Sequence, residues 1–391
     1  MTDTTPERTQ PGPRQAPWEL AVGPPPEHWD DWVELDPKSW PERIEKHYRC
    51  VPTICFNCES ACGLLAFVDK ATGETAKYEG NPVHPGSRGR TCAKGPATIN
   101  QVRDPERILR PLKRKGPRGS GKWVEVTWDE ALDDIGGRIR RALQEDRKEE
   151  VMYHVGRPGE DNFVLRMLQA WGIDGHNSHT NVCSASARLG YSLWFGADRP
   201  SPDYEDNEFI LLLSAHLETG HYFNPHAQRI IDAKSRGSRV AVVDCRLSNT
   251  TTHAERWISP WPGTEPALLL AVARELLASG RYDREFVERW TNWREYLADR
   301  DPDGEGTFER FVELLLELYA DYTPAHAVDE CRIEQGTVEY LAERIHAAGS
   351  RFTSHLWRNT AAGNLGGWQT ARALLLLHVL SGSVGTRGGL N

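Results

Sequence analysis

The sequence lacks any apolar run long enough to cross a membrane. Its longest apolar runs, such as residues 209–213, have the length of a β-strand, whereas a membrane helix needs roughly 18 apolar residues. The N-terminus has neither the apolar stretch of a secretory signal nor the Arg-Arg pair of a twin-arginine signal. We therefore expect a cytoplasmic protein, or one that reaches the cytoplasmic side of a membrane through partner proteins.

Long basic runs are also missing. The 391 residues carry a net charge of −9, and the short basic segment Lys113-Arg114-Lys115 is typical of a solvated loop. Nucleic acid is therefore not an expected partner. The eight cysteines do not suggest a disulfide framework. Four of them are clustered, and such clustering favours metal binding in a reducing compartment.

The clustered cysteines are the most informative feature of the chain. Cys55, Cys58 and Cys62 follow the spacing C-x2-C-x3-C, and Cys92 comes later, within Arg90-Thr91-Cys92-Ala93-Lys94-Gly95. Three thiolates on one tight loop and a fourth from a distant loop are typical of a [4Fe-4S] cluster. A structural zinc ion is the alternative. Zinc sites of this kind usually pair two C-x2-C motifs, and the second pair is absent here.

The chain is predicted to have three parts. Residues 1–45, rich in Pro, Trp and acidic residues, form an N-terminal extension that wraps a neighbour or stays mobile. Residues 46–105 form the cluster domain, which contains short strands. Residues 106–391 form an α/β region of two interleaved subdomains, because buried apolar strands such as 209–213 and 239–244 alternate with helical segments. That alternation predicts mostly parallel sheets, which bind ligands beyond the carboxyl ends of their strands.

Two local patterns refine this prediction. The segment 116–122 matches most of a phosphate-binding P-loop, but Trp123 follows it where Ser or Thr would bind magnesium, and a strand follows where a helix should begin. We interpret it as a hairpin turn. The segment Thr127-Trp128-Asp129-Glu130 is a capping box, which predicts a helix with apolar residues at helical spacing. A second helix is predicted at 266–279, capped by Thr264.

Several motifs occur in a recognisable order. They are the cysteine motif, Cys92-Ala93-Lys94-Gly95, Val243-Asp244-Cys245-Arg246, Pro262-Gly263-Thr264 and Ser381-Gly382-Ser383-Val384-Gly385. Together they resemble the molybdopterin oxidoreductases of the dimethyl sulfoxide reductase superfamily, from about residue 48 onward. The resemblance implies molybdenum or tungsten bound by two pyranopterin guanine dinucleotides, with a [4Fe-4S] cluster nearby.

The resemblance also implies roles for individual residues. Four cysteines are similar to the cluster ligands: Cys55, Cys58, Cys62 and Cys92. Cys50 is a possible substitute whose spacing fits less well. Lys94 resembles the lysine between cluster and pterin, where a positive charge would stabilise moving electron density. Cys183 lies in a segment like the one from which family members bind the metal through a side chain. The alternative is that Cys183 is a small buried packing residue. His179 and Arg358 are weaker candidates for the substrate pocket.

Five residues are similar to the family's nucleotide contacts: Asp244, Arg246, Thr264, His216 and Gly382. Asp244 follows a buried strand, where an acid can accept hydrogen bonds from a guanine edge or a ribose. Two departures weaken the match, since Cys245 replaces the usual proline and His216 stands where asparagine is common. Polar residues that merely cap strand ends are the alternative.

The implied function is that of a catalytic subunit that passes electrons between a substrate and a partner iron–sulfur subunit. A membrane anchor subunit is a further candidate partner. Formate-oxidising relatives often have histidine after the metal-binding residue, where this chain has Ser184, so a sulfur oxyanion or polysulfide is favoured. Formate dehydrogenase and nitrate reductase types, a non-catalytic electron-transfer or scaffold subunit, and a hydratase of the same fold remain alternatives. Family members are longer and carry a C-terminal β-barrel-like domain, so a missing C-terminal domain or chain is also expected.

Overall fold

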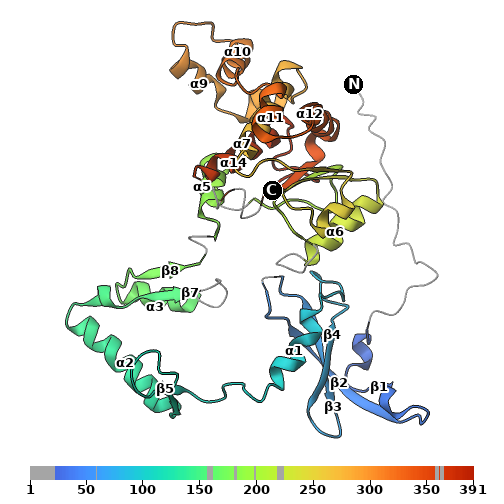
Figure 1. Cartoon of the computed structure of the whole chain (residues 1–391), viewed down its shortest axis with the longest axis vertical. Helices are drawn as coiled ribbons and strands as arrows, with labels where there is room; N and C mark the ends of the chain where they lie inside the picture. Colours follow the sequence, from blue (N-terminus) through green and yellow to red (C-terminus); the bar gives the residue numbers. More distant parts are fainter. Residues whose placement is uncertain are drawn as a thin grey trace. The chain divides into compact units, whose positions relative to one another are not determined.

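The computed structural model describes residues 23–58, 60–155, 162–179, 183–197, 200–217, 224–356, 361 and 365–391. The chain divides into two compact units (Figure 1). The first contains the described residues up to Arg107, and the second contains nearly all described residues from Ile108 onward. Each unit is described by itself. No helix within the described ranges is long and apolar enough to cross a membrane.

The first unit is built on a four-stranded antiparallel sheet. Its strands follow one another in the order β1 (Trp32–Leu35), β2 (Glu45–Ile54), β3 (Gly63–Asp69) and β4 (Thr75–Gly80). Phe67 and Leu65 of β3 are fully buried, and they pack with Tyr48 and Cys50 of β2. The strand predicted over residues 63–68 is therefore confirmed.

The strand β1 lies in the segment that was expected to wrap a neighbour or stay mobile. For residues 32–35 that expectation is wrong, because they pair with β2 in register from Trp32 opposite Tyr48 to Leu35 opposite Glu45. The physical reason is the apolar area of Trp29 and Trp32, which pack against the small core of the sheet. Short 3₁₀ helices, Pro26–His28 and Pro37–Ser39, flank the strand.

The second unit is built on a parallel sheet. It contains β9 (Phe209–Leu213), β10 (Arg239–Val243), β11 (Arg256–Ile258) and β12 (Phe352–Leu356), in the order β11-β10-β9-β12. All three neighbouring pairs are parallel, which confirms the predicted parallel α/β fold. Every residue of β9 is buried. Burial on both faces is what a parallel sheet with helices on either side requires.

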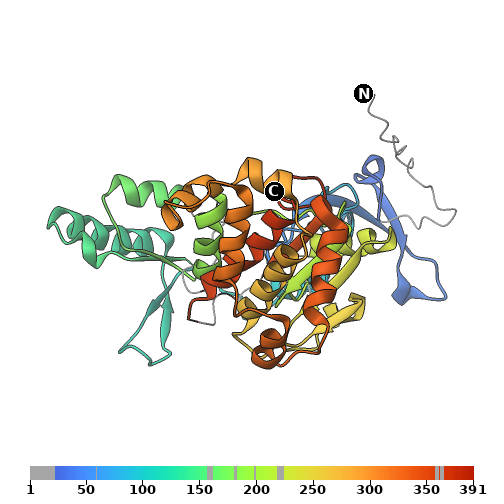
Figure 2. The ribbon, with the colours of Figure 1, turned by 90° about the horizontal axis from the view of Figure 1, so that it is seen from above.

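Helices enclose this sheet (Figure 2). The helix α7 (Glu265–Ala278) packs against α10 (Phe308–Leu318), α11 (Pro324–Cys331), α12 (Thr337–Ala348) and α14 (Gly367–Leu380). The remaining helices are α5 (Ala185–Phe195), α6 (Asn224–Ser235), α8 (Arg284–Trp290) and α9 (Trp293–Arg300). Short 3₁₀ helices lie at Lys148–Glu150, Asn249–His253 and Gly349–Arg351. The helices α5 and α14 approach closely at Gly190, where an added Cβ would lie 2.3 Å from the Trp368 carbonyl oxygen.

The second unit begins with smaller elements. The strands β5 (Leu112–Arg114) and β6 (Trp123–Glu125) form an antiparallel pair, so the interpretation of the intervening segment as a hairpin turn is confirmed. The strands β7 (Tyr153–Val155) and β8 (His176–Ser178) pair in parallel, and α3 (Asn162–Ala170) lies between them in the chain.

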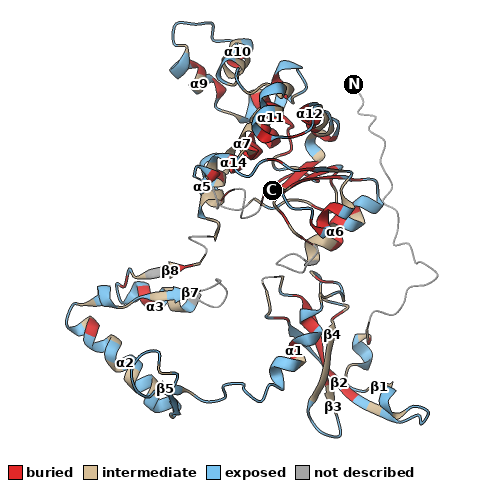
Figure 3. Cartoon of the chain, in the orientation of Figure 1, coloured by how far each residue is buried: buried red, intermediate tan, exposed pale blue. Residues whose placement is uncertain are grey.

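The helix α2 (Trp128–Gln144) begins with the predicted capping box at Thr127 and Glu130. Its apolar side is exposed (Figure 3), with Trp128 at 67%, Leu132 at 60% and Ile135 at 58% exposure. The predicted helix with apolar residues at helical spacing is therefore confirmed. The apolar side chains of its first turns are exposed in the described structure. An apolar surface of this kind is typical of a contact site for further polypeptide.

Candidate functional site

The four clustered cysteines line one cavity. Cys55 and Cys62 are buried, whereas Cys58 and Cys92 are half-buried. The cavity is small, about 10 Å³, and Asn57, Thr91 and Lys94 also line it. The loop between β2 and β3 provides three of the cysteines, and the segment before α1 (Lys94–Val102) provides the fourth. The structure thus brings together the four residues that the spacing selected.

Backbone hydrogen bonds hold these loops in shape. The Cys55 amide donates to the Cys62 carbonyl at 2.8 Å, which closes the first loop. Ala61 adopts a positive φ of 44°, an uncommon conformation for a residue with a Cβ. The Gly63 amide donates to the buried Ser87 hydroxyl at 3.1 Å and so ties the first loop to the segment before Cys92. Such strained and tied loops are typical of binding sites.

The donor set fits an iron–sulfur cluster. Four cysteine thiols line one cavity, three of them from one loop and the fourth from a distant segment. Such an arrangement is typical of a cubane cluster. Cys50 is not a substitute ligand in this structure. It is buried in the core of the sheet, away from the cavity, and burial raises its pKa to about 11.

Lys94 begins α1 and lines the same cavity, with an exposed side chain. Asn57, which sequence reasoning passed over, also lines it and donates to the Cys55 sulfur at 3.3 Å. An asparagine between two ligand cysteines carries no signal of its own in the sequence, because its role depends on where its side chain points.

Cys183 lies in the second unit, just before the helix α5. Its amide donates to the His179 carbonyl at 2.9 Å, so these two candidates are neighbours. Cys183 is half-buried. The next residue, Ser184, is the N-cap residue of α5, yet its hydroxyl makes no capping bond and has no hydrogen-bond partner in the described structure. Arg358, the other substrate-pocket candidate, lies outside the described residues.

Three cofactor candidates gather beyond the carboxyl end of β10. Asp244 follows the strand directly and accepts a hydrogen bond from the Arg246 amide at 2.8 Å. Thr264 stands before α7, but its hydroxyl donates to the Trp261 carbonyl at 2.7 Å instead of capping the helix. Thr264 is the N-cap residue of α7, as predicted, but its side chain makes no capping hydrogen bond, because its backbone (φ −99°, ψ 1°) is not in the extended conformation of a typical N-cap.

A second acid joins this group. Glu265 is buried, and its carboxylate accepts a hydrogen bond from the Gly263 amide at 2.8 Å. Burial, with a smaller contribution from Asp244, raises its pKa. Two carboxyl groups, one after a strand and one at the start of a helix, can accept hydrogen bonds from adjacent N–H groups of one ligand. In the sequence, Glu265 is an acidic residue in the first turn of a predicted helix. That pattern is too common to identify Glu265 as a site residue.

A polar cluster lies near the point where the order of the parallel strands reverses. After β9, the chain places β10 on one side of β9, and it later places β12 on the other side of β9. The rings of Tyr204, His226 and His355 meet here in tilted contacts, with centroids 4.9 Å apart for Tyr204–His226 and 6.1 Å for Tyr204–His355. Burial lowers the pKa of His226 to about 4 and that of His355 to about 3. Both imidazoles are therefore neutral at pH 7.

Several buried polar atoms in this region have no hydrogen-bond partner in the described structure. They are the Tyr204 hydroxyl, both amide atoms of Gln228, and Nε2 of His216. His216 lies three residues after the end of β9, and Gln228 lies in the first turns of α6. Buried polar groups without partners are rare in native proteins and are usually satisfied by something that binds there. A crevice at the strand reversal is also where such sheets bind nucleotides.

Gly382 is not part of either group. It lies directly after α14 with a positive φ of 67°, and an added Cβ would lie 2.4 Å from the Asp283 carboxylate. A tight turn and close packing therefore explain this glycine without a cofactor. Nearby, the buried His378 bonds to Ser354 and Ser383, each at 2.7 Å.

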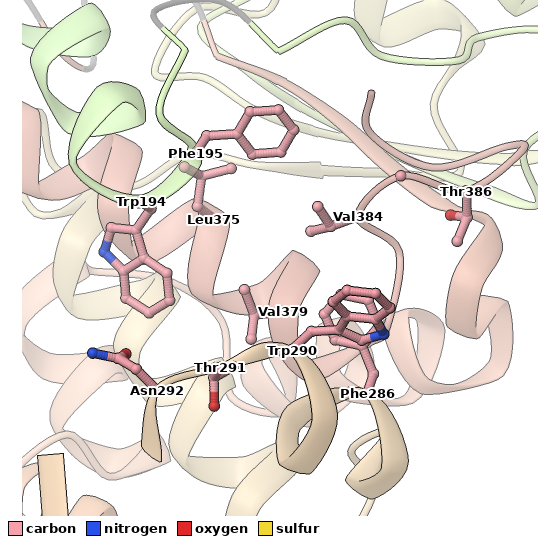
Figure 4. Close-up of a pocket in the computed structure, with 11 residues that line it drawn as sticks. Trp194, Phe195, Phe286, Trp290, Thr291, Asn292, Leu375, Val379, Val384 and Thr386 are labelled. Atoms are coloured by element: carbon pink, nitrogen blue, oxygen red, sulfur yellow. The ribbon is translucent and has the colours of Figure 1, made fainter. Parts of the chain in front are cut away.

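An open groove of about 800 Å³ lies elsewhere on the second unit (Figure 4). Aromatic and aliphatic side chains from α5, α8 and α14 line most of it, namely Trp194, Phe195, Phe286, Trp290, Leu375 and Val379. None of the candidate cofactor residues lies in its wall. Its lining is mainly apolar, so it fits apolar contact with another surface better than the catalytic chemistry considered above.

Comparison with known families decides the interpretation of these sites. The family model described as Molybdopterin oxidoreductase matches residues 107–390, and the model described as Molybdopterin oxidoreductase Fe4S4 domain matches residues 48–104. The chain belongs to the molybdopterin oxidoreductase family. This membership indicates a [4Fe-4S] cluster and molybdenum bis-pyranopterin guanine dinucleotide as the cofactors. The cysteine cavity fits the first, and the acids and unpartnered polar atoms at the strand ends fit the second.

Named relatives of this molybdopterin oxidoreductase are of several kinds. A sulfite dehydrogenase subunit of Allochromatium vinosum is 31% identical over 70% of this chain and 28% of its own length. The thiosulfate reductase molybdopterin-containing subunit of Salmonella typhimurium is 28% identical over 63% of this chain and 32% of its own. The structure of acetylene hydratase from Pelobacter acetylenicus matches with a TM-score of 0.73 and 21% identity, over 87% of this chain and 44% of that one. The chain thus spans less than half the length of these relatives.

Proposed function

We propose that this chain is the catalytic-subunit portion of an enzyme that exchanges two electrons with a sulfur oxyanion or polysulfide. It would pass them one at a time to a partner iron–sulfur protein. The observation that carries the proposal is the cavity lined by Cys55, Cys58, Cys62 and Cys92 within a molybdopterin oxidoreductase chain. When bound, the metal–pterin cofactor supplies the two-electron chemistry, and the cluster supplies one-electron transfer.

The residues of the chain would hold and tune these groups. Four thiolates would ligate the iron cluster, and the cationic Lys94 at the same cavity would stabilise negative charge there. The thiolate of Cys183 would ligate the molybdenum or tungsten, because a soft sulfur donor suits such metals. Asp244 and Glu265 would accept hydrogen bonds from a guanine edge. His179, whose carbonyl bonds to the Cys183 amide, would stand beside the substrate.

Two features support a sulfur substrate. Relatives named sulfite dehydrogenase and thiosulfate reductase resemble this chain over 70% and 63% of its length. Ser184 stands directly after Cys183, where formate-oxidising members often have histidine. Sulfite oxidation would consume one water and release sulfate, two protons and two electrons. In the reduction of thiosulfate or polysulfide, electrons would pass from the partner protein to the substrate.

Further polypeptide would complete the enzyme. Exposed apolar side chains on α2 and around the groove of Trp194 and Trp290 are the surfaces that such a segment or partner subunit would cover. We infer a partner iron–sulfur subunit, and with it a membrane anchor, on the cytoplasmic side. Clustered reduced cysteines suit that compartment.

The deciding experiment combines metal analysis with turnover of the complete enzyme purified without oxygen. We expect about four irons per chain, the content of one cubane, together with molybdenum or tungsten and bound guanine nucleotide. Sulfite, thiosulfate and polysulfide should support turnover with redox dyes, and formate and nitrate should not.

Two variants make the test specific. Cys183→Ser should abolish turnover while iron content stays unchanged, since Cys183 lies outside the cluster cavity. Cys50→Ala should keep the iron, because Cys50 lies in the core of the sheet. One zinc in place of iron would reject the cluster. Unchanged turnover in Cys183→Ser would instead favour the non-catalytic scaffold, and hydration without electron transfer would favour a hydratase.

A further inference from the structure

Asn57 connects the two loops that provide the cluster cysteines. Its amide nitrogen lies 3.3 Å from the Cys55 sulfur, 3.2 Å from the Lys94 carbonyl oxygen and 2.9 Å from the Thr98 hydroxyl. Cys55 belongs to the first loop, whereas Lys94 and Thr98 belong to α1, which follows Cys92. One side chain therefore spans both halves of the cysteine cavity.

The chemistry of the three neighbours fixes which end of the amide faces them. The Thr98 hydroxyl donates its proton to the Lys94 carbonyl at 3.2 Å, so it can accept a hydrogen bond from Asn57. The carbonyl oxygen and the cysteine sulfur are also acceptors. The NH₂ end of Asn57 therefore faces these acceptors, because the amide oxygen would be repelled by them, and its two hydrogens are shared among the three.

The side chain is also held firmly. Thr98 is buried at 6% exposure, and the rest of α1 fixes its position. The half-buried Asn57 amide is therefore anchored to α1 through its contact with the buried Thr98. A donor held at a set distance from a metal-binding sulfur can act on the metal centre without touching it.

We propose that Asn57 is a positioning residue that sets the reduction potential of the cluster by donating a hydrogen bond to the Cys55 sulfur. The inference rests on the proposed role of Cys55 as a cluster ligand. Reduction adds one electron, part of whose charge resides on the ligand sulfurs. A hydrogen bond to a more negative acceptor is stronger, so the Asn57 donor stabilises the reduced state. Hydrogen bonds to the sulfurs are among the factors that determine cluster potentials.

The test is a redox titration of the cluster in the complete enzyme, followed by electron paramagnetic resonance, with iron analysis of each sample. Asn57→Leu removes the donor at similar volume. At a fixed potential its ratio of reduced to oxidised cluster should fall roughly tenfold, a lowering of about 59 mV for a one-electron couple. Asn57→Asp should shift the ratio further in the same direction, since it replaces the donor with a negative charge.

Two further variants serve as controls. Asn100→Leu makes the same change at an exposed position of α1, and it should leave the potential unchanged. Thr98→Val keeps Asn57 but removes one of its anchors, so it should lower the potential by less than Asn57→Leu does.

The outcomes separate this inference from the proposed function. Four irons and an unchanged potential in Asn57→Leu would overturn the role of Asn57 and leave the cluster in place. Absence of iron from the unaltered enzyme would overturn the ligand assignment instead. If Asn57→Leu loses its iron, Thr98→Val becomes the deciding variant. A reduction potential of the cluster in Thr98→Val equal to that in the unaltered enzyme would then overturn the inference.

Discussion

The buried histidine His378 makes stability depend on pH in a calculable way. Its ring is fully buried on α14, bonds to Ser354 through Nε2 and to Ser383 through Nδ1, and stacks on Phe352 with centroids 4.5 Å apart. Burial lowers its pKa from 6.5 to about 3. Between pH 6.5 and about 3, the imidazole is therefore neutral in the folded protein but protonated in an unfolded chain.

The sign and size of the effect follow from linkage. Between pH 6.5 and about 3, the unfolded state binds a proton that the folded state does not, so stability falls as the pH falls. At pH 5 the unfolded pKa is about 1.5 units above the solution pH, and each unit is worth ~1.4 kcal/mol. His378 should thus contribute about 2 kcal/mol of acid destabilisation between pH 7 and pH 5.

The assay compares His378→Asn with the unaltered protein by urea unfolding, followed by circular dichroism, at both pH values. At pH 7 the variant should be less stable by about 2–3 kcal/mol, because it leaves a small cavity and an unpaired serine. At pH 5 this difference should shrink by about 2 kcal/mol. His346→Asn, at an exposed position of α12, should show the same pH dependence as the unaltered protein. A stability difference in His378→Asn that is equal at both pH values would refute the reasoning.

Two other changes test the binding regions. Glu265→Gln should weaken retention of guanine nucleotide roughly tenfold, since it removes one charged acceptor beside Asp244; unchanged nucleotide content after dialysis would count against a role in binding. Gly80→Ala would place a Cβ 1.9 Å from the Gly89 carbonyl oxygen, so it should displace the segment before Cys92 and reduce iron content. Full iron content and an unchanged unfolding midpoint in that variant would show that the segment adapts.

The sequence predicted those features that depend on local pattern. The strands β9 and β10 contain the continuous apolar runs 209–213 and 240–243, and the capping box at Thr127 is a local hydrogen-bond motif, so both features are recognisable without a structure. The cysteine spacing reflects the geometry of a cluster directly. In each case the residues that specify the feature lie within a short stretch of chain.

Features that depend on tertiary contacts could not be predicted. The strand β1 forms because Trp32 packs against residues of β2 and β3. The ring contacts among Tyr204, His226 and His355 join three separate segments, and none of these residues stands out from its neighbours in the sequence. Thr264 makes no side-chain capping bond because its backbone is not extended at the N-cap, and a sequence pattern does not reveal that conformation.

The placement of β12 beside β9 has a consequence for how the protein is made. The segment before β9 is tied to the segment after α14, for example through the Gly388 amide and the Asp203 carboxylate, which are 185 residues apart in sequence. During synthesis, β9 therefore pairs with β10 long before its other partner has left the ribosome. One edge of an apolar strand stays open for that time, and such edges invite wrong pairing. Correct folding of the second unit should thus require that this edge is kept from wrong pairing until β12 is available.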